Sequence, residues 1–201
     1  ITLIAFALAA PAHAAESIDY LLAHAAEEPE WSALALQAAG VSANASLVSR
    51  ETTGAPTDLA RRILALAAVG LDPRPLAVAL EATVVNGSVS GDQYINDDIF
   101  AIMALCAAER AASSEPLQTI SAFVLAQQRS DGGWGVTTLS RSDVDSTAAA
   151  IQALFSVGLT GDPIVRGLTY LHTQQNDDGG FPFRKPSTTN SASTAWALSA
   201  L

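Results

Sequence analysis

Apolar residues recur at helical spacing along most of the chain, in stretches that Gly, Pro and polar residues interrupt. Several interruptions place a proline at or near the start of the next stretch, where its missing N–H would be unpaired in any case. No alternation of apolar and polar residues is long enough to predict a strand. We therefore expect an all-α fold, with helices over Ser17–Ala26, Trp31–Ala39, Ala43–Arg50, Asp58–Val69, Arg74–Val84, Asn96–Glu109, Glu115–Gln128, Asp145–Val157, Pro163–Gln175 and Ser193–Leu201.

A repeat with an offset of 47 residues organises the second half of the chain. Residues 127–134 (QQRSDGGW) match residues 174–181 (QQNDDGGF), and Ser146-Thr147-Ala148 matches Ser193-Thr194-Ala195 at the same offset. An Ala-Leu pair also recurs near the end of every second predicted helix, at residues 35–36, 65–66, 104–105, 153–154 and 200–201. Such periods are typical of stacked helical hairpins, so we expect five hairpins, each formed by a first helix and the second helix that follows it.

The two helices of each expected hairpin differ in their polarity. The second helices are apolar on nearly all sides, as in residues 99–107, whereas the first helices are amphipathic. A helix that is apolar all round is buried. We therefore expect an inner ring of second helices inside an outer ring of first helices, with all inner helices starting at one mouth of the ring.

Acidic and small polar residues mark the starts of the inner helices. Such residues are good N-caps, and acids at a helix start also face the positive end of the helix dipole. The alternative is that the ring gathers them, with apolar side chains of the same helices, around a central cavity that binds a ligand. The candidate cavity residues are Asp97, Asp98, Phe100, Met103, Asp145, Phe155 and Trp196, of which the apolar ones have packing between the rings as their other interpretation.

Composition and charge exclude several classes of function. The net charge of −10 argues against nucleic acid as a partner, because phosphate binding needs clustered Lys and Arg. The single cysteine excludes an intramolecular disulfide. Spacings typical of metal sites, nucleotide-binding loops and nucleophile elbows are absent from the sequence, so we predict no metal and no cofactor.

The two ends of the chain carry predictions of their own. Residues 1–14 (ITLIAFALAAPAHA) form a short apolar run that ends in a small-x-small pattern, which predicts an N-terminally incomplete secretory signal. The mature protein would then be secreted or displayed at the cell surface, and no later segment predicts a membrane span. Residues 15–201 form the predicted helical domain, which we expect to be truncated because the chain stops inside an apolar helical pattern.

The repeat resembles the QW repeat of squalene and terpene cyclases. Residues 166–181 contain the series basic-Gly, aromatic-Leu, Gln and Gly-x-aromatic that is typical of this repeat, with Phe181 in place of the usual Trp. The upstream copy keeps Trp134 but lacks the basic-Gly pair. The resemblance implies an α/α toroid of six hairpins, five of them present here, as in prenyltransferases, terpene cyclases and cobalamin carriers. It also implies a structural role for Gln128, Trp134, Gln175 and Phe181.

A second motif bears on catalysis. Residues 143–148 (DVDSTA) are similar to the Asp-x-Asp-Asp-Thr-Ala motif of squalene-hopene-type cyclases, whose middle acid protonates a terminal alkene. The resemblance assigns that role to Asp145, with Asp143 beside it, while Ser146 replaces the third acid. The position of Asp145 at a helix N-terminus favours its ionised form, and the chain has few aromatic side chains to stabilise a carbocation.

Three functions remain open from the sequence. The first is a secreted, non-catalytic module that binds an isoprenoid or a corrinoid or acts as a surface scaffold, with a sixth hairpin and a further domain beyond residue 201. The alternative is a cyclase-like or prenyltransferase-like enzyme that acts on an isoprenoid, with Asp145 as the general acid. The third is a purely structural module. We expect the first of these.

Overall fold

The computed structural model describes residues 13–49, 51–89 and 93–201, and most of the predicted signal segment lies outside these ranges. Within them the chain forms nine α-helices, one short 3-10 helix and no strand, which confirms the all-α prediction. None of these described helices is both long and apolar enough to cross a bilayer. The helices are α1 (His13–His24), α2 (Pro29–Ala38), α3 (Pro56–Ala68), α4 (Arg74–Glu81), α5 (Ile95–Ala107), α6 (Glu115–Ala126), α7 (Val144–Ser156), α8 (Asp162–Gln174) and α9 (Ser191–Ala200).

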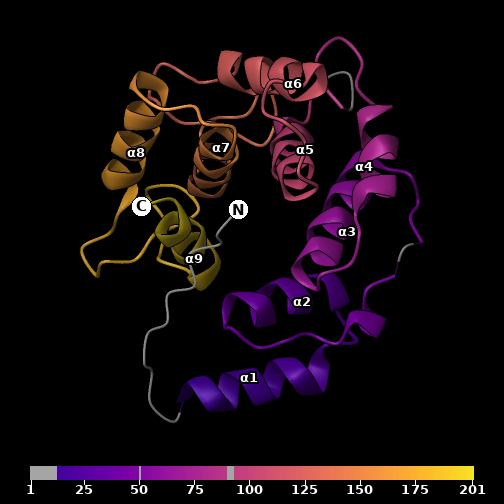
Figure 1. Cartoon of the computed structure of the whole chain (residues 1–201). Helices are drawn as coiled ribbons and strands as arrows, with labels where there is room; N and C mark the ends of the chain where they lie inside the picture. Colours follow the sequence, from indigo (N-terminus) through magenta and orange to yellow (C-terminus); the bar gives the residue numbers. More distant parts are fainter. Residues whose placement is uncertain (1–12, 50, 90–92) are drawn as a thin grey trace.

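The helices form a curved array of two layers (Figure 1). Helices α2, α3, α5, α7 and α9 form the inner row, in which each packs against the next, and α4, α6 and α8 lie outside it. Buried residues occupy most sides of α5 and α7, whereas each outer helix buries a single stripe. The expected division into apolar inner and amphipathic outer helices is therefore present, while a closed toroid of six hairpins stays a prediction.

Small residues allow the inner helices to approach one another closely. The central part of α7 is Ala148-Ala149-Ala150-Ile151, and all four residues are buried between neighbouring helices. Alanine contributes little side-chain bulk and has the best helix propensity. The same sequence feature thus favours the helix itself and its position between α5 and α9.

The expected pairing of helices within hairpins is wrong for α4, α6 and α8, whereas α1 packs on α2 as expected. Each outer helix packs mainly on the inner helix before it, so the hairpins are α3–α4, α5–α6 and α7–α8. The connections explain this order, because residues 69–73, 108–114 and 157–161 are short turns, while the return segments 82–94, 127–143 and 175–190 are long. Short connections place successive helices side by side as antiparallel neighbours.

The helix expected over Ala43–Arg50 is also wrong, because only a 3-10 turn forms there, at Ala45–Leu47. Polar side chains hold the chain on either side of it in a non-helical path. The Asn44 side chain accepts a hydrogen bond from the Ser46 N–H at 3.0 Å. Local bonds of this kind compete with helix formation.

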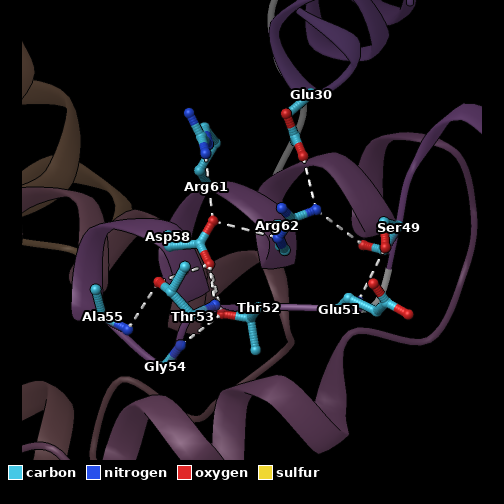
Figure 2. A network of polar contacts seen from close by, with 10 residues as sticks. All are labelled: Glu30, Ser49, Glu51, Thr52, Thr53, Gly54, Ala55, Asp58, Arg61 and Arg62. Carbon is cyan, nitrogen blue, oxygen red and sulfur yellow. Dashed lines mark hydrogen bonds and ion pairs between the residues drawn. The ribbon is translucent and has the colours of Figure 1, made fainter.

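A polar network then fixes the following segment to α3 (Figure 2). Asp58 Oδ2 accepts hydrogen bonds from the Thr52 hydroxyl at 2.6 Å and the Thr53 N–H at 2.7 Å. Arg62 donates to Glu30 of α2 at 2.8 Å, which ties α2 to α3. Burial would raise the pKa of Asp58, but the hydrogen bonds from Thr52 and Thr53 and the charge of Arg62 together hold it well below its usual range.

Helices α3, α5, α7 and α9 start at the same end of the array, as the sequence predicts. Thr57 at the start of α3 donates to Asp97 Oδ1 at the start of α5, at 2.5 Å. The N–H of Val144, at the start of α7, donates to the carbonyl of Phe183 at 3.0 Å. The long return segments therefore meet at this end of the array, where the polar residues of the candidate site also lie.

Candidate functional site

The first acid of the DVDSTA segment caps α7. Asp143 has an extended backbone, its Oδ1 accepts the Ser146 N–H at 2.7 Å, and its Oδ2 accepts the Ser146 hydroxyl at 3.1 Å. The side chain is fully buried. Burial raises the pKa of Asp143, and the two hydrogen bonds from Ser146 offset only part of that effect. Ser146 thus uses its hydroxyl on Asp143, at the position where the cyclase motif has a third acid.

Asp145 differs from Asp143 in its surroundings. It lies in the first turn of α7 and is half-buried. Its Oδ1 is shielded from solvent and has no hydrogen-bond partner among the described residues. Buried polar atoms are almost always paired, so an orphaned carboxyl oxygen at this position is available to a ligand or to a proton.

Trp134 anchors the start of α7 from the return segment. Its backbone N–H donates to the Thr147 hydroxyl at 2.9 Å, its carbonyl accepts the Asp143 N–H at 3.0 Å, and its indole donates to the carbonyl of Val124 at 2.8 Å. The side chain is fully buried. These bonds connect α6, the return segment and α7 around the two acids.

Arg184 reaches the same place from the next return segment. Its guanidinium donates to the carbonyls of Ser142 and Arg141 at 2.8 and 3.1 Å. The segment before α9 therefore holds the segment before α7. The approach to Asp143 is fixed from two sides.

The four residues to which the resemblance assigns a structural role make contacts in the loops before α7 and α9. The Gln128 side chain donates to the carbonyls of Gly132 and Pro163 at 2.9 and 2.8 Å, which ties α6 to the start of α8. The Gln175 side chain donates to the Gly179 carbonyl at 2.8 Å. Phe181, like Trp134, is buried.

Three aromatic rings from three inner helices meet. Phe100 of α5 has edge-to-face contacts with Trp31 of α2 and Trp196 of α9, both with ring centroids 6.1 Å apart. Helices α2 and α9 lie towards opposite ends of the inner row, so rings that both reach α5 lie on the inner side of the curve (Figure 1). We call this group the aromatic cluster.

The other predicted cavity residues are placed differently. Asp97 accepts the hydrogen bond from Thr57, whereas Asp98 is fully buried and accepts from the Ser88 hydroxyl and the Val89 N–H at 2.9 and 2.8 Å. Met103 packs against the core. Phe155 is 62% exposed and belongs to no ring pair among the described residues.

Trp31 was not among the residues singled out from the sequence. It is 41% exposed, and its helix gives no polar motif that would draw attention to it. Only the curvature of the inner row brings it to Phe100. The sequence could have pointed to Trp31 only through a general expectation that the aromatic side chains of the inner helices meet inside the ring.

Two surface hollows are lined by residues outside the aromatic cluster. One of about 430 Å³ is lined by residues 126–131, Thr138, Arg141 and Ser142, and one of about 520 Å³ lies beside Thr194 and Leu198. Neither is lined by Asp97, Phe100 or Asp145. Within the described part of the chain, no group of three His, Cys, Asp or Glu side chains is placed to hold a metal ion.

Comparison with known proteins finds a similarity to a terpene synthase. No family model matches the chain. Over 78 residues, or 38% of the chain, the sequence is 37% identical to a drimenyl diphosphate synthase of Streptomyces showdoensis. The matched part is 15% of the length of that synthase. The chain is thus weakly similar to part of a terpene synthase, and this likeness supports a terpene-cyclase-like helical fold.

Proposed function

We propose that this chain belongs to a protein that cyclises an isoprenoid, and that Asp145 donates the proton that starts the reaction. The orphaned, solvent-shielded Oδ1 of Asp145 carries the proposal. The similarity to a drimenyl diphosphate synthase supports an isoprenoid diphosphate as substrate and favours the enzyme over the non-catalytic module.

The proposed reaction is a cyclisation that starts when a positioned carboxylic acid protonates the substrate. When the Asp145 carboxyl carries a proton, it gives that proton to the terminal C=C bond of the isoprenoid, which leaves a carbocation on the substrate and a carboxylate on Asp145. The next double bond attacks that cation and closes a ring, and the final cation loses a proton to a base. The product is therefore an isomer of the substrate and keeps its diphosphate.

The neighbouring residues would keep the donor in place. Asp143 fixes the first turn of α7 through its two bonds from Ser146, and Trp134 fixes the segment before it. The aromatic cluster offers ring faces of the kind that attract cations. These residues orient the donor and the chain of the substrate, while Asp145 alone transfers the proton.

The test follows the proton. The full-length protein is incubated in D2O with isoprenoid diphosphates of 15 and 20 carbons, and the products are analysed by mass spectrometry. A cyclic isomer that has gained one deuterium is expected. Asp145→Asn keeps the shape but removes the donor, and should lower kcat by about 10²–10⁴-fold.

A matched control and a contrary result complete this test. Asp178→Asn changes an exposed acid in the return segment before α9 and should leave the rate unchanged. Activity that survives Asp145→Asn with the same deuterium content would remove Asp145 from its proposed role.

One observation favours the non-catalytic alternative. Ser146 replaces the third acid, and its hydroxyl is occupied by Asp143. A secreted binding module would show a thermal shift with polyenes, prenyl diphosphates or a corrinoid but no deuterated product. A ligand at about 100 times its Kd stabilises by about 2.7 kcal/mol, which a melting experiment detects.

A further inference from the structure

The last two return segments make the same hydrogen bonds, 47 residues apart. Asp131 Oδ1 accepts from Gly133 N and the Ser142 hydroxyl at 3.0 and 2.8 Å, and Asp178 Oδ1 accepts from Gly180 N and the Thr189 hydroxyl at the same distances. The hydroxyls of the threonines in α7 and α9 accept the N–H of Trp134 and Phe181, both at 2.9 Å. Each residue around α9 can therefore be compared with its counterpart around α7.

Around α7, the outer helix α8 contacts three residues of this kind, namely Gln128, Gly132 and Ile151. The carbonyl of Pro163, at the start of α8, accepts a hydrogen bond from Gln128. A Cβ added to Gly132 would lie 2.5 Å from the carbonyl oxygen of Arg166, so the loop and α8 are in close contact. Gly167 of α8 lies over Ile151, which is only 3% exposed.

Around α9, the counterparts of these residues are uncovered. Gln175 is exposed, and its side chain donates to the carbonyl of Gly179 in its own loop. A Cβ added to Gly179 would meet nothing within 4 Å. Leu198, the counterpart of Ile151, is 60% exposed, and Ala195 beside it is exposed as well. We call Gln175, Gly179, Ala195 and Leu198 the α9 face.

We propose that the α9 face is the docking site of a further outer helix of the same polypeptide, with the chemistry of α8. That helix starts with a residue whose carbonyl accepts from Gln175, and it carries a glycine over Leu198. The proposal continues the α7–α8 interface by one repeat and does not depend on the proposed function. The hollow of about 520 Å³ beside Thr194 and Leu198 lies on this side of α9.

The experiment supplies such a helix in register. Leu201 is the counterpart of Leu154, so a copy of residues 155–174 is added directly after Leu201 of the 201-residue chain. The added helix should raise the melting midpoint by at least about 3 °C, a shift that a modest gain in stability produces at this chain length. Amide hydrogen exchange in α9 should slow by about tenfold or more.

The control is the same extension with the counterpart of Gly167 changed to leucine. Leucine has a much better helix propensity than glycine, so a general effect of added helix would stabilise more. Docking on the α9 face predicts the opposite, because the side chain would collide with Leu198. Gln175→Ala in the extended protein should also reduce the gain.

Three results would overturn the proposal. The two extensions could stabilise equally, or neither could change the melting midpoint or the exchange of α9. In the third, the unextended chain is a dimer that Leu198→Asp dissociates, and the added helix gives no gain, in which case a second copy occupies the α9 face.

Discussion

At the scale of single residues, the N-cap of α7 is a buried carboxyl group, whereas the N-cap of α9 is an uncharged amide. Asp143 and Asn190 are counterparts in the repeat, and each accepts an N–H three residues later, at 2.7 Å from Ser146 and 2.9 Å from Ser193. The amide caps as well as the carboxylate does. It does so without a charge, whereas Asp143 places its carboxyl in a fully buried position.

Asp143→Asn should therefore remove the free-energy cost of a buried charge and keep the N-cap hydrogen bond. Because burial raises the pKa of Asp143 in the folded protein, wild-type stability falls as the pH rises from about 4, the usual value for Asp, through the raised value. The Asn variant should lack this fall, and at pH 7 it should be at least as stable as the wild type in urea unfolding. Relative to the Asn variant, Asp143→Ala should lose about 1 kcal/mol at both pH 3.5 and pH 7, because neither variant titrates at this position and only the cap differs. An Asn variant as unstable as the Ala variant at pH 7 would mean that the charge itself stabilises the fold.

At the scale of helices, glycine in the middle of α8 is explained by what lies opposite it. Gly167 costs about 1 kcal/mol in helix propensity relative to alanine. A Cβ there would lie 3.0 Å from Ile151 and 3.1 Å from Trp134, both buried. The glycine thus allows α8 to approach α7 and the buried indole.

Substitution of Gly167 should separate propensity from packing. Gly167→Ala should raise the free energy of unfolding by less than the difference of about 1 kcal/mol in helix propensity between the two residues. Gly167→Leu should lower it by about 1–3 kcal/mol through overpacking. Val165→Leu on the exposed side of α8 is the matched control and should change stability by less than about 0.5 kcal/mol. Chemical denaturation of the three variants measures this, and a stabilised Gly167→Leu would show that α8 does not pack closely on α7.

Helix positions were predictable because Gly, Pro and capping residues separate the apolar stretches. The pairing of helices into hairpins was not predictable from the apolar pattern, because that pattern is the same whether an outer helix packs on the preceding or the following inner helix. The lengths of the connections decide the pairing. Ala43–Arg50 failed because a few local side-chain bonds outweigh a weak helical pattern over eight residues. Within the candidate site, the acids of α7 were recognisable from their motif, whereas the burial of Asp98 against residues 88–89 depends on a loop that no periodicity describes.

At the scale of the whole molecule, the aromatic cluster links parts of the array that the chain itself connects only distantly. Trp31 comes from near the start of the inner row and Trp196 from its last helix, and both contact Phe100. Edge-to-face ring pairs contribute about 0.5–1.5 kcal/mol beyond the area that they bury. Replacement of Phe100 should therefore remove two stabilising contacts, one with α2 and one with α9.

Phe100→Leu keeps an apolar side chain but removes both ring contacts, so we expect a loss of about 1–3 kcal/mol, or about 2–12 °C in melting midpoint at this chain length. Phe123→Leu makes the same chemical change on α6, where Phe123 packs on the core and no ring pair with it is present among the described residues, and it should cost less. Trp31→Leu combined with Phe100→Leu should cost less than the sum of the two single changes, because the pair shares one contact. Strict additivity in this cycle would mean that the two rings are neighbours without energetic coupling.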